Sequence, residues 1–232
     1  MTPELSRTRT DRTGDKRSRI VDAAIKVFAE KGFFTARVSE IAREAGVADG
    51  TIYLYFENKD DLLIQVFEES MVRVVESLTV ALRGAVGPED KLRRFVEHHL
   101  ALVEDNRELA EVLTVELRQS AKFMKEHKNP RFAEYLRIAA EIYEEGIERG
   151  VFRPDITPWL QARALFGMLD ELALTWVLGR AFDIRRAADE VHGVLMNGLR
   201  LRAPGQAPVV AAATQQGGTG EDSGDGETGH RP

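Results

Sequence analysis

Residues 38–63 read VSEIAREAGVADGTIYLYFENKDDLL, and this stretch decides the fold. Apolar residues recur at helical spacing over residues 38–45, and Gly46 follows them as a residue that can take the left-handed conformation found just past a helix end. A second short helix is predicted over residues 49–56, and Asn58 then precedes a longer one. Two short helices joined by a tight glycine turn are typical of a helix-turn-helix.

The sequence on either side of this motif is also helical in its spacing. Upstream, the apolar residues between 20 and 28 follow the repeat of one buried helix face, and this helix is predicted to end near Gly32. Downstream, a long helix is expected from residue 59 to about residue 85, where Gly87 and Pro88 break it. Further helices are expected over residues 89–105, 107–125, 131–149, 158–178 and 183–201. With no competing strand pattern, we expect an all-α fold of about nine helices.

These elements divide into two domains with a tail at each end. Residues 16–58 form the predicted three-helix, helix-turn-helix DNA-binding head, and residues 59–202 form a larger helical domain for effector binding and dimerisation. Residues 1–15 are basic and polar, and residues 203–232 are rich in Gly, Thr, Ala and acids, with few bulky apolar side chains to bury. Such composition predicts disorder at both ends.

Composition excludes several classes of protein. The 232 residues include no cysteine, which rules out disulfides, thiolate metal sites and cysteine nucleophiles and is typical of a cytoplasmic protein. No apolar run reaches the roughly 18 residues that a membrane helix needs, so we expect no membrane partner. The net charge is −6, yet residues 7–37 carry nine Lys or Arg against four Asp or Glu. This segment can therefore lie against phosphate, although a solvated basic tail would show the same charge.

The second short helix has features that suit the major groove of DNA. It begins Asp49-Gly50-Thr51, so its first N–H groups and the Thr51 hydroxyl can face phosphate. Tyr53 and Tyr55 follow, and a tyrosine can place a hydroxyl beside phosphate and a ring beside thymine methyl groups, although it can equally be a half-buried packing residue. Lys59, at the start of the next helix, completes a predicted clamp on the DNA backbone.

A family resemblance rests on the residues of this region. Ile41-Ala42, Ala45-Gly46-Val47, Gly50-Thr51-Ile52-Tyr53, Tyr55-Phe56, Asn58-Lys59 and Leu62-Leu63 resemble the DNA-binding domain of the TetR family. The resemblance implies a transcriptional repressor that reads a palindromic operator in double-stranded DNA as a homodimer. Arg37 stands where the family often has a threonine at the start of the second helix. The helix thereby loses a side-chain cap, but Arg37 can instead contact phosphate. The predicted DNA-binding residues are Arg37, Ser39, Asp49, Gly50, Thr51, Tyr53, Tyr55 and Lys59.

Dimerisation is part of this prediction because one head cannot occupy two half-sites about one helical turn, roughly 34 to 36 Å, apart. The last two predicted helices have wide apolar faces. They also include Gly167, Gly193 and Gly198, which allow helices to approach closely. The alternative is that these faces belong to the core of one chain. We expect a four-helix bundle made by two copies.

A second, narrower resemblance concerns the effector domain. Residues 113–120 (LTVELRQS), 166–178 (FGMLDELALTWVL) and 47–56 resemble the FadR-type branch, the regulators of fatty-acid degradation. The resemblance implies that a long-chain acyl-CoA is the small-molecule effector that releases the protein from DNA. It implies no other cofactor and no metal.

Candidate effector-binding residues follow from the apolar and charged positions of these segments. An acyl chain needs an apolar tunnel, which Leu113, Leu117, Phe166, Leu169 and Trp176 can line, although such residues are more often core. The charged residues Arg118, Asp170 and Glu171 interrupt apolar helices and need partners, so we predict an ion pair from Arg118 to Asp170 or Glu171, with or without contact to the ligand. Cations for a CoA headgroup are available at Lys91, Arg93 and Arg94, which can also be a solvated helix start.

Other functions find less support. A ferritin-like metalloenzyme requires two Glu-x-x-His pairs from its bundle, which the chain does not carry, and adjacent His98 and His99 face different sides of a helix. A hydrolase of the Gly-x-Ser-x-Gly type is excluded because that motif is absent. We therefore expect a regulator and not an enzyme. The open alternative is a TetR-type repressor that senses a drug or another apolar metabolite.

Overall fold

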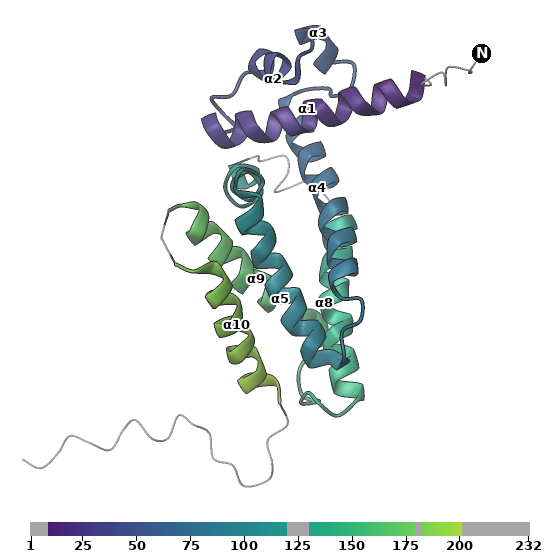
Figure 1. The fold of residues 1–232 in the computed structure, drawn as a ribbon, viewed down its shortest axis with the longest axis vertical. Helices are drawn as coiled ribbons and strands as arrows, with labels where there is room; N and C mark the ends of the chain where they lie inside the picture. Colours follow the sequence, from purple (N-terminus) through teal and green to yellow (C-terminus); the bar gives the residue numbers. More distant parts are fainter. Residues whose placement is uncertain (1–8, 120–129, 180–181, 201–232) are drawn as a thin grey trace, which may run out of the picture. The chain divides into compact units, whose positions relative to one another are not determined.

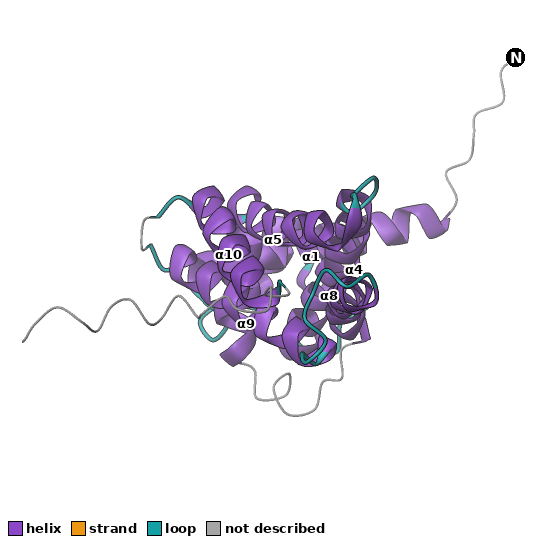
Figure 2. Cartoon of the chain, turned by 90° about the horizontal axis from the view of Figure 1, so that it is seen from below, coloured by secondary structure: helices purple, strands orange, loops and turns teal. Residues whose placement is uncertain are grey.

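A computed structural model describes residues 9–119, 130–179 and 182–200, drawn as coloured ribbon in Figure 1. This part of the chain contains nine α-helices and no β-strand (Figure 2). A single antiparallel bridge joins Phe152 to Arg200 within it. The prediction of an all-α fold with about nine helices is confirmed. None of the helices in the described ranges is long and apolar enough to cross a membrane.

The head contains the first three helices, α1 (Arg9–Lys31), α2 (Val38–Ala45) and α3 (Asp49–Ile52). The predicted stripe on α1 is buried, with Ile20, Ala24 and Phe28 showing no exposed surface, and α1 packs mainly on α2. Small buried side chains on α2 allow this close packing. As Figure 1 shows, α2 and α3 lie together along one side of α1.

The turn between α2 and α3 follows the glycine signal in the sequence. Gly46 has φ of 65°, and its N–H donates to Arg43 O at 3.1 Å while the N–H of Val47 donates to Ala42 O at 2.9 Å. The Arg19 side chain of α1 also donates from Nη2 to Ala45 O at 2.5 Å. These bonds satisfy the carbonyls at the end of α2, so the turn is held both by its own backbone and by α1.

Helix α4 (Lys59–Ala81) leads from the head into the larger domain. Its first turn is capped by Asn58, whose Oδ1 accepts from the N–H of Asp61 at 2.8 Å. Leu62 and Leu63 at its start and Leu78 near its end are all buried. Helix α4 is therefore anchored by buried side chains at both of its ends.

The larger domain is built from four longer helices, namely α5 (Gly87–Asp105), α8 (Pro130–Glu148), α9 (Pro158–Val177) and α10 (Ile184–Leu199). Helix α8 packs on α9, α10 packs on α5, and α5 also contacts α8 (Figure 2). The core includes an especially close contact at Gly146, where a Cβ would lie 1.9 Å from the ring of Phe152. Only a glycine fits at this position of α8.

The segment predicted as one helix over residues 107–125 differs most from expectation. The structure has α6 (Arg107–Glu111), a π-helical turn (Val112–Glu116) and a 3-10 turn (Leu117–Gln119) in its described part. The Thr114 hydroxyl donates to Ala110 O at 2.8 Å, and the buried Glu116 side chain reaches the head. The periodicity of the sequence cannot show this change of helix type, because a tertiary contact accompanies it.

Several predicted boundaries also move. Helix α1 begins at Arg9, so residues 9–15 of the predicted disordered tail are helical, because the helix nucleated by the buried stripe extends through polar residues at little cost. Helix α3 ends at Ile52 and not at residue 56, with turns from there to Phe56, and α4 ends at Ala81. The predictions for residues 1–8, 120–125 and 201–232 lie outside the described residues.

Candidate DNA-binding face and effector pocket

A shallow depression on the head brings together most of the predicted DNA-binding residues. It is lined by Arg37 just before α2, Ser39 of α2, Asp49 of α3, Tyr53 just after α3, and Lys59 of α4. Tyr53 is 58% exposed, so its hydroxyl and ring are available to a partner and do not serve as core. The depression therefore collects five of the eight predicted residues from three separate helices.

The remaining three predicted residues lie on α3 or just after it. Gly50 is exposed and has open space where a Cβ would be, which lets another backbone approach closely. Thr51 and Tyr55 are half-buried. The sequence reasoning missed Leu54, which is 80% exposed between the two tyrosines. The sequence offers no clear signal for it, because the neighbouring residues Ile52 and Phe56 are equally apolar and are buried.

Lys59 has a different environment from the one predicted. Its Nζ lies 2.7 Å from Phe33 O and 3.1 Å from both Phe34 O and Ala36 O, and it also lies over the Phe33 ring. An ammonium group has three hydrogens, and these three carbonyls can accept all of them. The Lys59 side chain thus holds the loop between α1 and α2. A phosphate contact by this residue stays a prediction.

Arg37 loses its side-chain cap as expected, but Glu40 supplies part of a replacement. The Arg37 N–H donates to Glu40 Oε2 at 3.0 Å, while Lys31 Nζ donates to Glu40 Oε1 at 2.7 Å. The bond from Lys31, followed by that from the Arg37 N–H, holds the pKa of the Glu40 carboxyl below its usual value. The Arg37 side chain is exposed at the rim of the depression, where it can meet phosphate.

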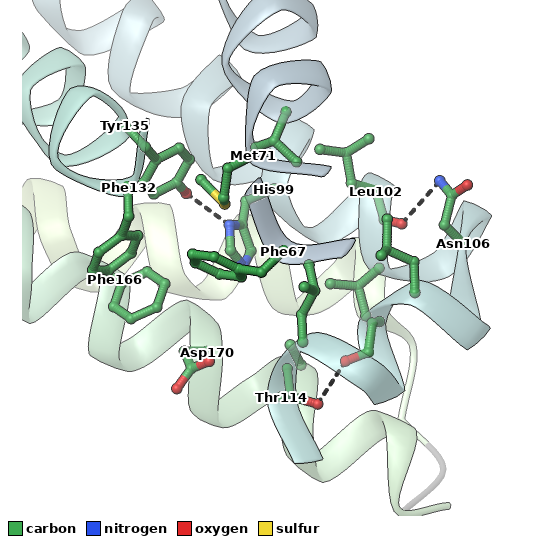
Figure 3. Close-up of a pocket in the computed structure, with 16 residues that line it drawn as sticks. Phe67, Met71, His99, Leu102, Asn106, Thr114, Phe132, Tyr135, Phe166 and Asp170 are labelled. Atoms are coloured by element: carbon green, nitrogen blue, oxygen red, sulfur yellow. Dashed lines mark hydrogen bonds between the residues drawn. The ribbon is translucent and has the colours of Figure 1, made fainter. Parts of the chain in front are cut away.

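The effector domain contains an apolar pocket of about 120 Å³ between α4, α5, α6, the π-helical turn, α8 and α9 (Figure 3). Most of the lining side chains are aliphatic or aromatic. The apolar members are Phe67, Met71, Val74, Leu102, Val103, Leu109, Ala110, Leu113, Phe132, Phe166 and Ala173, and the polar members are His99, Asn106, Thr114, Tyr135 and Asp170. An apolar cavity with few polar groups is typical of a site for an apolar small molecule.

Three of the seven predicted effector residues line this pocket: Leu113, Phe166 and Asp170. The predicted ion pair between Arg118 and Asp170 is present, with Arg118 at the surface. The other predicted residues do not line the pocket.

Leu117 and Leu169 are buried in the core, 3% and 0% exposed, and are not among the lining residues. Trp176 lies under the guanidinium of Arg107, 5.1 Å from it, and also does not line the pocket. A leucine or tryptophan on an apolar helix serves core and cavity equally, so sequence cannot separate the two.

The most informative residues that sequence reasoning missed are His99 of α5 and Tyr135 of α8. His99 Nδ1 lies 2.7 Å from the Tyr135 hydroxyl, as Figure 3 shows. Burial, with a smaller effect of His98, lowers the pKa of His99 to about 4, and burial raises the pKa of Tyr135. Both groups are therefore neutral near pH 7. A signal was present, because His99 interrupts the apolar face that runs through Phe95 and Val103.

The three cations proposed for a CoA headgroup are already paired. Lys91 Nζ lies 2.5 Å from Glu145, Arg93 Nη1 lies 3.2 Å from Asp189, and Arg94 Nε lies 3.2 Å from Asp90. None of the three cations lines the pocket, whose residues on α5 begin at His99, five to eight positions further along. Contact between these residues and a CoA headgroup therefore stays a prediction, and it would compete with the ion pairs that they make here.

A contact connects the neighbourhood of the pocket to the head. Glu116 ends the π-helical turn that also carries Leu113 and Thr114, and its Oε2 accepts from the N–H of Phe33 at 2.5 Å. Phe33 belongs to the loop between α1 and α2 whose carbonyls bind Lys59. The effector domain thus contacts the loop that begins the helix-turn-helix.

Comparison with known proteins finds a family match for the head and another for the larger helical region. Residues 20–66 match the N-terminal domain of the bacterial regulatory proteins of the tetR family, and residues 67–198 match the YsiA-like protein C-terminal region. The chain belongs to the TetR family of transcription regulators.

Relatives within the TetR family agree with the narrower resemblance. The fatty acid metabolism regulator protein of Bacillus subtilis is 36% identical over 79% of this chain and 95% of its own length. The crystal structure of FadR from Bacillus subtilis in complex with stearoyl-CoA matches with a TM-score of 0.73 and 36% identity, covering 78% of this chain and 98% of that one. FadR from Bacillus halodurans matches with a TM-score of 0.71 and 39% identity, over 79% and 99% of the two chains.

These findings confirm that this TetR-family chain is a FadR-type transcription regulator with a helix-turn-helix domain, and not an enzyme. They also agree with the geometry. The first family match covers the depression on the head, and the second covers every residue that lines the pocket.

Proposed function

We propose that this protein is a dimeric repressor of fatty-acid degradation genes that leaves its operator when a long-chain fatty acyl-CoA occupies the pocket. The single observation that carries the proposal is the apolar pocket beside the π-helical turn, whose Glu116 contacts the head. The likeness to a FadR crystallised with stearoyl-CoA supports the choice of ligand.

The surface of the head supports operator binding. Gly50, Tyr53 and Leu54 are exposed on and after α3, and Arg37 lines the same depression as Tyr53. A guanidinium and a tyrosine hydroxyl can contact phosphate, while a leucine side chain can lie against the methyl group of thymine. We assign base contact to the segment around Tyr53 and Leu54 and backbone contact to Arg37.

The outer faces of α9 and α10 support dimerisation. Leu160 and Val194 are 50% and 65% exposed, and Gly167, Gly193 and Gly198 have open space where a Cβ would lie. Exposed apolar side chains beside glycines allow a second pair of helices to pack closely, and an interface between identical faces produces a two-fold dimer. Two heads related in this way read two half-sites of a palindrome.

The proposed mechanism is an equilibrium between two conformations. The ligand binds more tightly to the one in which the heads are wrongly placed for the operator, and it can shift the equilibrium only by that difference in affinity. The bond from Glu116 to Phe33 and the shared helix α4 are the connections through which the pocket can displace the head. Coupling of about 1 to 3 kcal/mol lowers operator affinity about 5- to 150-fold.

The test begins by isolating an operator from a pool of random duplexes with the purified protein. Operator affinity is then measured by fluorescence anisotropy with palmitoyl-CoA and, as the matched control, with free CoA. We expect a two-fold symmetric sequence and a loss of affinity with palmitoyl-CoA alone. Release by drug-like apolar compounds and not by palmitoyl-CoA would assign the pocket to another ligand, and failure to enrich any sequence would refute operator binding.

A further inference from the structure

The hydrogen bond between His99 and Tyr135 leaves one polar hydrogen of this pair without a partner in the described part of the chain. A neutral imidazole carries one N–H and the hydroxyl carries one O–H, so the pair has two hydrogens in all. One of them occupies the 2.7 Å contact between His99 Nδ1 and Tyr135 Oη. Among the described residues no second hydrogen bond is made by either group, so one donor remains for something else.

The chemistry of the two groups decides which one holds the free donor, because a phenolic O–H is a stronger donor than a neutral imidazole N–H and an imidazole nitrogen is a better acceptor than a phenolic oxygen. Contacts with Phe95, 5.0 Å away, and with Phe132 hold the Tyr135 ring so that its oxygen lies beside His99. Figure 3 shows the hydroxyl pointing at one ring nitrogen, with the other nitrogen on the opposite edge of the imidazole. When the hydroxyl donates to Nδ1, the remaining hydrogen lies on Nε2 of His99, a residue that lines the pocket.

An unpaired N–H in an apolar cavity influences which part of a bound ligand lies next to it. It favours a hydrogen-bond acceptor over a methylene, because a buried donor without a partner is costly. It does not favour a carboxylate here. The Asp170 carboxylate also lines the pocket, and Arg118, which pairs with it, is already engaged. A second negative charge at this depth would meet repulsion and desolvation.

We propose that His99 Nε2 donates a hydrogen bond to the carbonyl oxygen of the bound acyl ester or thioester, and that Tyr135 is a positioning residue that fixes the imidazole tautomer. This inference rests on the proposed acyl-CoA effector and adds to it. His99 makes the pocket selective for a neutral carbonyl over both a carboxylate and a plain methylene chain.

The test compares two ligands that differ only at the carbonyl. Palmitoyl-CoA and S-hexadecyl-CoA have the same chain length and headgroup, but the thioether has a methylene where the thioester has the carbonyl. By titration calorimetry we expect the wild-type protein to bind the thioester about 3- to 10-fold more tightly, the factor for one net hydrogen bond. In a second comparison, methyl laurate should bind more tightly than laurate.

Variants of His99 assign the preference to this residue. His99→Phe keeps an aromatic ring without a donor and should bind both CoA compounds with equal affinity, whereas His99→Gln keeps an N–H and should restore the preference for the thioester. Tyr135→Phe should weaken the preference without abolishing it. The measured quantity is the ratio of the affinities of one variant for palmitoyl-CoA and for S-hexadecyl-CoA. A general loss of stability lowers both affinities and leaves this ratio unchanged.

The outcomes separate this proposal from the function on which it rests. If the wild-type protein binds the thioester and the thioether equally, or if His99→Phe keeps the full preference, the role of His99 is wrong while the acyl-CoA effector stands. If neither CoA compound binds and neither changes operator affinity, the acyl-CoA effector itself is wrong.

Discussion

Gly46 and Gly50 lie four residues apart in the helix-turn-helix, yet their substitution has opposite expected effects. Gly46 has φ of 65°, and a Cβ there would lie 3.1 Å from Arg19 Nη2, which caps α2. Gly46→Ala should lower the free energy of unfolding by about 1 kcal/mol or more and the melting temperature by about 2 to 4 °C. Thermal unfolding measures this change.

Gly50→Ala is the matched control for that substitution. Gly50 lies within α3 with open space around its Cα, so alanine should leave stability unchanged or raise it by up to about 1 kcal/mol. It should nevertheless weaken operator binding, because the added methyl group occupies the surface offered to the DNA backbone. Equal stability of Gly46→Ala and the parent, or full operator affinity of Gly50→Ala, would contradict this interpretation of the turn.

His99 also predicts how stability depends on pH. Its pKa is about 4 in the folded protein and about 6.5 in the unfolded chain, so only the unfolded chain gains the proton as the pH falls through this interval. The free energy of unfolding should therefore fall between pH 6.5 and pH 4, by on the order of 2 kcal/mol. The titratable neighbours from the packed elements are His98, Tyr135 and Asp170.

Chemical denaturation at several pH values measures this dependence. His99→Gln, which keeps the hydrogen-bonding groups but does not titrate in this range, should show a smaller loss over the same interval. An equal loss in the wild-type protein and in His99→Gln would assign the pH dependence to other residues.

The segment from α6 to the 3-10 turn connects the pocket to the head, because it carries residues that line the pocket and Glu116, which contacts Phe33. Glu116→Ala leaves the N–H of Phe33 without its carboxylate acceptor, a change that should destabilise the attachment of the head by about 1 to 3 kcal/mol. We expect the ratio of operator affinities without and with palmitoyl-CoA to move toward one. Glu116→Gln retains an acceptor oxygen and should keep most of the ratio.

Anisotropy titrations of the two variants with and without ligand measure that ratio. Calorimetry on the same samples checks that palmitoyl-CoA still binds, since neither change alters a residue that lines the pocket. Full release of operator by Glu116→Ala would show that the signal passes by another route, with α4 as the remaining candidate.

At the scale of the whole molecule, function requires two copies. Val194→Arg places a charge on the exposed apolar face of α10, where the side chain is 65% exposed, and should shift the protein toward a monomer with greatly reduced operator affinity. Val86→Arg is the matched control, because Val86 is 86% exposed just before α5 and belongs to neither α9 nor α10. Sedimentation velocity gives the oligomeric state of each variant, and a dimeric Val194→Arg would exclude this face as the interface.

The helical fold, the turn at Gly46 and the exposure of Tyr53 could be predicted from the sequence, because they depend on local spacing and local backbone conformation. The sequence also predicted that Arg118 pairs with Asp170 or Glu171, since charges on apolar helices need partners, and the structure has the pair with Asp170. The tertiary structure alone decided which apolar residues line the pocket, that Lys59 binds carbonyls of the head, and that His99 meets Tyr135. The contacts of Lys59 and His99 join residues 23 to 36 positions apart in the sequence. Periodicity shows which face of a helix is apolar, but it does not show which other helix or loop packs against that face.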